Sequence, residues 1–87
     1  MNNPNLVECI YQYLKNKYNS LPVTYSLAYE DPCVRISRNW NLGIIFYLEM
    51  FCVIGTKYCG FYNYTSEYNP SNPEFFNNID IIIKEIL

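Results

Sequence analysis

The feature that most constrains the fold of this chain is an apolar, aromatic stretch covering residues 42–64. Its first half, residues 44–53, is rich in β-branched and aromatic side chains and lies between Gly43 and Gly55. Such a run fits either a strand or a buried helix, and its length between the two glycines favours a strand. A tight turn at Gly55 then returns the chain as the last strand, over residues 58–65.

Two amphipathic helices are predicted at the ends of the chain, because apolar residues recur there every three or four positions. The first helix begins at Asn3-Pro4, where Asn caps and Pro occupies the first turn, and it ends near residues 18–19. Ser71 or Asn72 caps the second helix, with Pro73 in its first turn. The predicted stripe of the first helix is Leu6, Ile10, Leu14 and Lys17 or Tyr18, widened by Val7 and Tyr13. That of the second is Phe75, Phe76, Ile79, Ile82, Ile83 and Ile86, and Asn77, Asp80 and Lys84 are expected to face water.

Between these helices the pattern changes to the two-residue period of strands. Residues 23–29 and 33–39 both alternate, and a turn is predicted at Glu30-Asp31-Pro32. Residues 39–43 form the next connection. The sequence therefore predicts one α+β domain over residues 1–87, a four-stranded antiparallel meander flanked by an N-terminal and a C-terminal helix.

The predicted hairpin assigns its side chains to two faces, because directly opposed residues share a face. A turn at residues 55–56 places Val53 opposite Tyr58 and Cys52 opposite Cys59. One face is nearly all apolar and comprises Ile44, Phe46, Leu48, Met50, Cys52, Cys59 and Phe61, with Asn63 near its end. The other face is half tyrosine and comprises Ile45, Tyr47, Glu49, Phe51, Val53, Tyr58, Tyr62 and Tyr64.

We expect both helices to cover the apolar face, which leaves the tyrosine face open to a partner. An open aromatic face of this size is unusual for a monomer. The alternative is one helix on each face, with the tyrosines acting only as good sheet residues. Arg35, on a neighbouring strand, is expected to stack on these rings. The predicted partner-binding residues are Arg35, Tyr47, Glu49, Phe51, Tyr58, Tyr62 and Tyr64.

Catalytic and metal-binding chemistry finds little support in the sequence. The chain has no histidine, so no Cys–His or Ser–His pair can form. Its four cysteines are scattered without a CxxC and are expected to be reduced thiols, a Cys52–Cys59 disulfide being the alternative. Glu49 is the one acid in an apolar strand, and an interfacial hydrogen bond is favoured over a role as a tuned acid. No enzyme activity, cofactor or metal is predicted.

Charge and hydropathy restrict the class of partner. Six basic against eight acidic residues give a net charge of −2, which argues against a nucleic-acid groove. Residues 57–64 nevertheless resemble in part the RNA-recognition-motif signature, through Lys57, Gly60, Phe61 and Tyr64. The resemblance implies base stacking on an open sheet. The predicted order of elements differs from the βαββαβ order of that family.

No segment has the length of a membrane span or the form of a secretion signal, so a cytoplasmic protein is expected. The function expected is a small protein–protein interaction module that acts sterically through its tyrosine-rich face. Its most concrete form is an inhibitor, an immunity-type protein or a phage or mobile-element accessory protein. The alternatives are a homodimeric structural or adaptor protein, and a single-stranded RNA-binding module.

Overall fold

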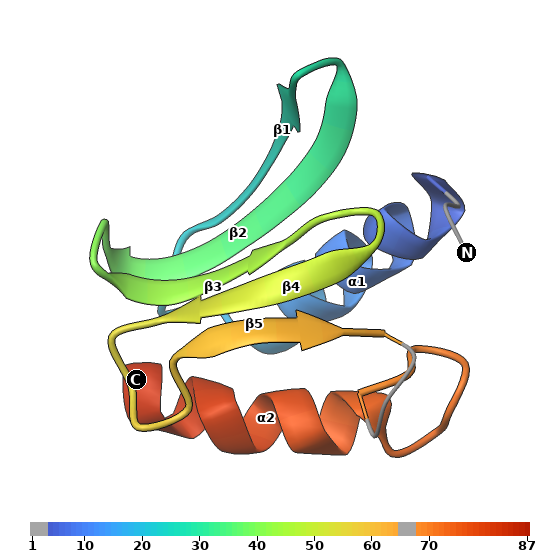
Figure 1. Ribbon diagram of the computed structural model, residues 1–87. Coiled ribbons are helices and arrows are strands. Elements are labelled where there is room, and N and C mark those ends of the chain that lie inside the picture. The colour runs from blue at the N-terminus through green and yellow to red at the C-terminus, as the bar shows by residue number, and fades with distance from the viewer. Residues whose placement is uncertain (1–3, 65–67) are drawn as a thin grey trace.

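The computed structural model describes residues 4–64 and 68–87, in which the α+β class is confirmed and the sheet has five strands instead of the predicted four. The elements are α1 (Pro4–Lys17), β1 (Val23–Ala28), β2 (Asp31–Asn39), β3 (Leu42–Phe46), β4 (Met50–Ile54), β5 (Gly60–Asn63) and α2 (Phe75–Ile86). Both helices lie on the same side of an antiparallel meander, as Figure 1 shows, with α1 behind the strands and α2 below β5.

Helix α1 follows the predicted stripe, with Val7, Ile10 and Leu14 fully buried against the sheet. The helix ends at Lys17, close to the predicted end, where positive charge suits the helix dipole. Asn3, the predicted cap, lies outside the described residues.

The β1–β2 hairpin turns one position earlier than predicted. Its two-residue loop is Tyr29-Glu30, and both residues have positive φ, 55° and 68°. Asp31 and Pro32, predicted to form the turn, instead begin β2. Positive φ at both loop positions is the type I′ geometry that matches the twist of a hairpin, and here the sheet imposes it on two residues that seldom adopt it.

The predicted long strand over residues 44–53 is wrong, because the chain reverses in the middle of it. Strands β3 and β4 pair with each other, Phe46 lying opposite Phe51 and Ile44 opposite Val53. The Tyr47 N–H donates to the Met50 oxygen (2.9 Å) and closes the turn between the two strands. No glycine, proline or asparagine marks this turn, and its only sequence signal is the charge of Glu49 within the apolar run.

This reversal exchanges the two predicted faces from residue 50 onward. In an antiparallel pair, opposed residues share a face. Phe51 and Val53 therefore lie on the same face as Ile44 and Phe46. A straight strand would have placed Phe51 and Val53 on the opposite face from Ile44 and Phe46. The β4–β5 register is also two residues away from the prediction, since Cys52 lies opposite Phe61 instead of Cys59.

The β4–β5 connection is longer than the predicted turn at residues 55–56 and runs from Gly55 to Cys59. Gly55 adopts φ +90°, and a Cβ there would stand 2.3 Å from the Asn41 oxygen. β5 is correspondingly shorter than predicted, Gly60–Asn63, and Thr65 of the predicted strand lies outside the described residues.

Helix α2 starts at Phe75, two residues after the predicted Pro73. The N-cap residue is Glu74, which makes no side-chain cap hydrogen bond, so neither Ser71 nor Asn72 caps this helix as predicted. The Asn72 side-chain oxygen instead accepts from the Glu74 N–H (2.9 Å) in the turn that precedes the helix. At the other end of the helix, Arg38 donates to the main-chain oxygens of Leu87 (2.6 Å) and Ile86 (3.5 Å). Arg38 lies at a register irregularity of β2 between Ser37 and Asn39.

One core lies between the helices and the sheet. The alternative with one helix on each face is therefore excluded, because the buried residues of α1, α2 and the strands belong to a single cluster. Burial of the apolar side chains in this cluster is the main term that stabilises the fold. The cluster comprises Val7, Ile10, Leu14, Leu21, Val34, Ile36, Ile44, Phe46, Phe51, Val53, Tyr64, Phe75, Ile79, Ile82, Ile83 and Ile86.

Candidate functional site

The candidate site is the sheet face opposite the helices, here called the uncovered face. Its centre is a row of directly opposed residues that crosses all five strands, and in Figure 1 no helix lies in front of the strands. The register gives this row as Thr24, Arg35, Ile45, Cys52 and Phe61. The Phe61 side chain is 80% exposed, whereas Arg35, Ile45 and Cys52 are half-buried.

Tyr47 belongs to the same face, next to the thiols of Cys33 and Cys52. Burial raises the pKa of Tyr47, and these two thiols raise it further, while Arg35 lowers it. The phenol is therefore neutral at physiological pH and can donate and accept hydrogen bonds. The main-chain oxygen of Tyr47 accepts from the Tyr64 hydroxyl (2.9 Å), which connects this edge of the face to the core.

Arg35 does not stack on the aromatic rings as expected. Its guanidinium donates to the main-chain oxygens of Trp40 (2.7 Å) and Asn39 (3.3 Å) in the β2–β3 turn. This turn also carries the Trp40 side chain, which is 82% exposed. Arg35 thus fixes the turn that carries Trp40, through two hydrogen bonds to its main chain.

Two predicted partner-binding residues, Phe51 and Tyr64, lie in the core, so their placement on an open face was wrong. Phe51 is fully buried and Tyr64 is 7% exposed. Tyr62 lies on the same helix-covered face, half-buried, with its ring stacked on Phe51 at 4.9 Å between centroids. The unpredicted turn after β3 causes all three errors, because it changes which residues of β4 and β5 point toward the helices.

The other predicted residues lie at the surface but apart from one another. Glu49 is exposed in the β3–β4 turn. Tyr58 is half-buried in the β4–β5 loop, where Lys57 lies over its ring. Its backbone N–H donates to the side-chain hydroxyl oxygen of Thr56 (3.0 Å). Only Arg35 and Tyr47 of the predicted set share the uncovered face.

Phe61 and Trp40 are the exposed aromatic residues of this region that the sequence did not assign to the site. The unpredicted reversal after β3 explains the wrong face for Phe61, because it moves every later residue of the sheet to the other face. Trp40 lies within the predicted connection over residues 39–43. A correct turn after Phe46 would have moved Phe61 to the uncovered face, since opposed residues share a face.

The cysteines are all free thiols: Cys9 and Cys59 are exposed, Cys52 is half-buried and Cys33 is buried. Burial raises the pKa of the Cys52 thiol, and the nearby Cys59 thiol raises it further. A raised pKa makes a thiol a poorer nucleophile at neutral pH. Among residues 4–64 and 68–87, no group of three or more potential ligands could hold a metal ion.

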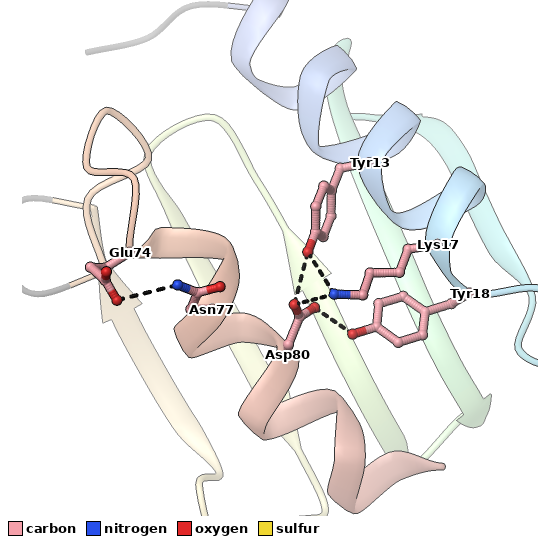
Figure 2. Close-up of polar contacts among 6 residues, drawn as sticks. All are labelled: Tyr13, Lys17, Tyr18, Glu74, Asn77 and Asp80. Atoms are coloured by element: carbon pink, nitrogen blue, oxygen red, sulfur yellow. Dashed lines mark hydrogen bonds and ion pairs between the residues drawn. The ribbon is translucent and has the colours of Figure 1, made fainter.

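A cluster of titratable side chains lies at the contact between α1 and α2, shown in Figure 2. Asp80 of α2 accepts hydrogen bonds from Lys17 (2.7 Å), Tyr13 (2.8 Å) and Tyr18. Burial raises the pKa of Asp80, but the bonds from Lys17, Tyr18 and Tyr13 outweigh it and hold the pKa below its ordinary value. A carboxylate that accepts three hydrogen bonds is a weak base, which argues against a catalytic role. The bonds instead join α2 to α1 and to the residue that follows α1. The expectation that Asp80 faces water was wrong.

An open hollow of about 440 Å³ lies between the tip of the β1–β2 hairpin and the β3–β4 turn. Tyr29 and Tyr47 line it together with the acidic residues Asp31 and Glu49. The described residues bring no nucleophile and base together there, so the hollow offers contact surface instead of a reaction site.

Comparison with protein-family models, with curated proteins and with solved structures finds no match for this chain. Neither α1 nor α2, the helices of the described residues, combines the length and apolar character needed to cross a bilayer.

Proposed function

We propose that this protein is a protein–protein interaction module that acts sterically, by covering a partner's surface with its uncovered sheet face. The observation that carries the proposal is the position of both helices on one side of the sheet, so that neither α1 nor α2 covers the row from Thr24 to Phe61. Inhibition of a partner, immunity to a toxin, or an accessory role in a phage or mobile element are the concrete forms that such a module takes.

The composition of the uncovered face supports a protein partner. Protein interfaces are enriched in aromatic residues and arginine, and exposed aromatic anchors dominate their energetics. Here Phe61 is 80% exposed and shares the uncovered face with Arg35 and Tyr47. Trp40, which is 82% exposed, lies in the β2–β3 turn that Arg35 holds. The low net charge, −2, gives no electrostatic reason to favour a phosphate backbone.

The proposal is tested with a matched pair of lysine substitutions. Phe61→Lys places a charge on the uncovered face, and Ile81→Lys places the same charge on α2, where Ile81 is 49% exposed. Affinity capture from the native source is followed by titration of the purified partner against each variant. We expect Phe61→Lys to weaken binding at least tenfold and Ile81→Lys to change it less than threefold, with far-UV circular dichroism unchanged in both.

Two results would overturn this proposal. One is a partner that binds Phe61→Lys as well as it binds the unmodified protein. The other is salt-sensitive binding of poly-U that Phe61→Lys abolishes while no protein is captured, which would favour the RNA-binding alternative.

A further inference from the structure

The outer edge of β1 is a second surface, distinct from the uncovered face. β1 is an edge strand of the sheet, and β2 is the only strand of the described residues that pairs with it. Natural proteins protect such edges with charged residues, proline, bulges or very short strands. β1 has six residues, Val-Thr-Tyr-Ser-Leu-Ala, with no charge, no proline and an unbroken register against β2. The opposite edge strand, β5, has four residues.

The hairpin geometry identifies the backbone groups that this edge offers. In a hairpin with a two-residue loop, the residues that flank the loop form a hydrogen-bonded pair, and such pairs then alternate along the ladder. Ala28 and Asp31 flank the loop here. Val23, Tyr25 and Leu27 therefore direct their N–H and C=O groups away from β2, toward the outside of the sheet.

Two large apolar side chains of this edge strand are exposed. Leu27 is 70% and Tyr25 is 40% exposed, although both belong to the helix-covered face. Figure 1 shows that the tip of the β1–β2 hairpin, which Leu27 and Ala28 approach, extends past both helices at the top of the molecule. Farther from the tip, the Tyr25 ring makes an edge contact with Tyr11 of α1 (5.6 Å between centroids) and keeps its other side exposed. Apolar side chains and unpaired backbone groups thus occur together on one strand.

We propose that β1 pairs with β1 of a second copy of this chain, antiparallel and centred on Tyr25, so that two five-stranded sheets become one continuous sheet. A two-fold axis through Tyr25 makes the contact self-complementary, as in most symmetric dimers. In this register Tyr25 lies opposite Tyr25 of the second copy, and the outward backbone groups of Val23 bond those of Leu27.

The side chains match in this register, which favours a second copy over an unrelated peptide. Val23 meets Leu27 and Tyr25 meets Tyr25 on the helix side, while Thr24 meets Ser26 on the uncovered side. Apolar, aromatic and hydroxyl pairs of this kind stabilise antiparallel strand pairs. No charged residue occurs in β1, so two copies meet without like-charge repulsion along the strand.

The first test compares two lysine substitutions on opposite edges of the sheet. The oligomeric state is measured by sedimentation velocity and light scattering over a concentration series up to the millimolar range. We expect concentration-dependent dimers of the unmodified protein. Leu27→Lys should raise the dimer dissociation constant at least tenfold, and Phe61→Lys should change it less than threefold. Leu27→Pro, which removes only an outward N–H, should act like Leu27→Lys.

The second test locates the two-fold axis by disulfide trapping. It uses a background in which the exposed Cys9 and Cys59 are replaced by serine. Opposed residues of a hydrogen-bonded pair have Cα atoms about 5.5 Å apart, within the range that a disulfide spans. Under mild oxidation, Tyr25→Cys should therefore form a covalent dimer, whereas Leu27→Cys, which lies opposite Val23, should not.

Three outcomes overturn the inference. The first is a monomer at every concentration. The second is a dimer that survives Leu27→Lys and Leu27→Pro but is lost in Phe61→Lys, which assigns self-association to the uncovered face. The third is faster cross-linking of Leu27→Cys than of Tyr25→Cys, which shows a different register. Far-UV circular dichroism of each variant establishes that it is folded before these comparisons are made.

Discussion

Replacement of Phe51 by alanine tests the central geometric finding, the reversal of the chain after β3. The Phe51 side chain is fully buried. Its ring meets the rings of Tyr62 (4.9 Å), Tyr68 (5.3 Å), Phe46 (5.5 Å), Tyr64 (5.9 Å) and Phe75 (6.3 Å). Had the chain continued straight, Phe51 would lie on the open face, where its removal would cost little.

The magnitude follows from the burial of the ring and the cavity that its removal leaves. Phe→Ala substitutions in cores cost about 3–5 kcal/mol. A domain of 87 residues is stable by about 4–13 kcal/mol, so this substitution removes a large share of the total. Since 1 kcal/mol shifts the melting temperature of a domain of this size by roughly 4–8 °C, we expect a fall of at least about 12 °C.

The assay is urea and thermal unfolding followed by far-UV circular dichroism, with Phe61→Ala as the matched control. Phe61 lies on the neighbouring strand and is 80% exposed, so its removal should change stability by no more than about 0.5 kcal/mol. If Phe51→Ala does not fold, Phe51→Leu retains most of the volume and gives a smaller, measurable loss. Losses of no more than about 0.5 kcal/mol for both Phe51 variants would refute the reversal of the chain.

Three further predictions concern the helix pair, the hairpin tip and the end of α2. Because the folded-state pKa of Asp80 is lowered, its stabilising effect is complete above about pH 4 and is lost as the pH falls through the folded-state pKa. Asp80→Asn should therefore lose about 1–2 kcal/mol at pH 7 and show a shallower acid-induced loss of stability in urea titrations, and an unchanged acid profile would contradict the role of the cluster. Asn and Gly tolerate positive φ, so the double variant Tyr29→Asn, Glu30→Gly should raise stability by about 1 kcal/mol, and a lower melting temperature would count against a type I′ turn. Arg38→Ala should remove about 1 kcal/mol and speed amide exchange in the last turn of α2, whereas exchange confined to β2 would argue against the contact with Leu87.

The local sequence pattern was sufficient to predict which faces of the two helices and of the first two strands point toward the core. The stripe of Val7, Ile10 and Leu14 and that of Ile79 and Ile83 predicted which helix faces are buried, because a period near 3.6 residues places them on one side. Alternation in β2 likewise predicted that Val34 and Ile36 share a face opposite Arg35. In each case the information lies within one element, so no knowledge of its neighbours was needed.

The candidate site was harder to predict because the face that a residue of β4 or β5 occupies depends on where the preceding turn lies. Tyr47, Leu48 and Glu49 contain none of the residues that usually mark a turn, and the run around them is continuously apolar. One unrecognised reversal changed the face of every later residue in the sheet. Arg35 and Tyr47, which precede the reversal or lie at its start, were placed correctly, and Phe51, Tyr62, Tyr64 and Phe61 were not.

The sequence by itself determined the α+β class, the two amphipathic helices and a chain with no histidine for base catalysis, since composition and short-range periodicity are local properties. Only the tertiary structure decided that the sheet has five strands, that both helices cover one face and that Phe61 and Trp40 are exposed. The physical reason is that a face of a sheet is defined by pairing between strands distant along the chain. The side that a residue occupies is therefore set by the packing of the whole domain.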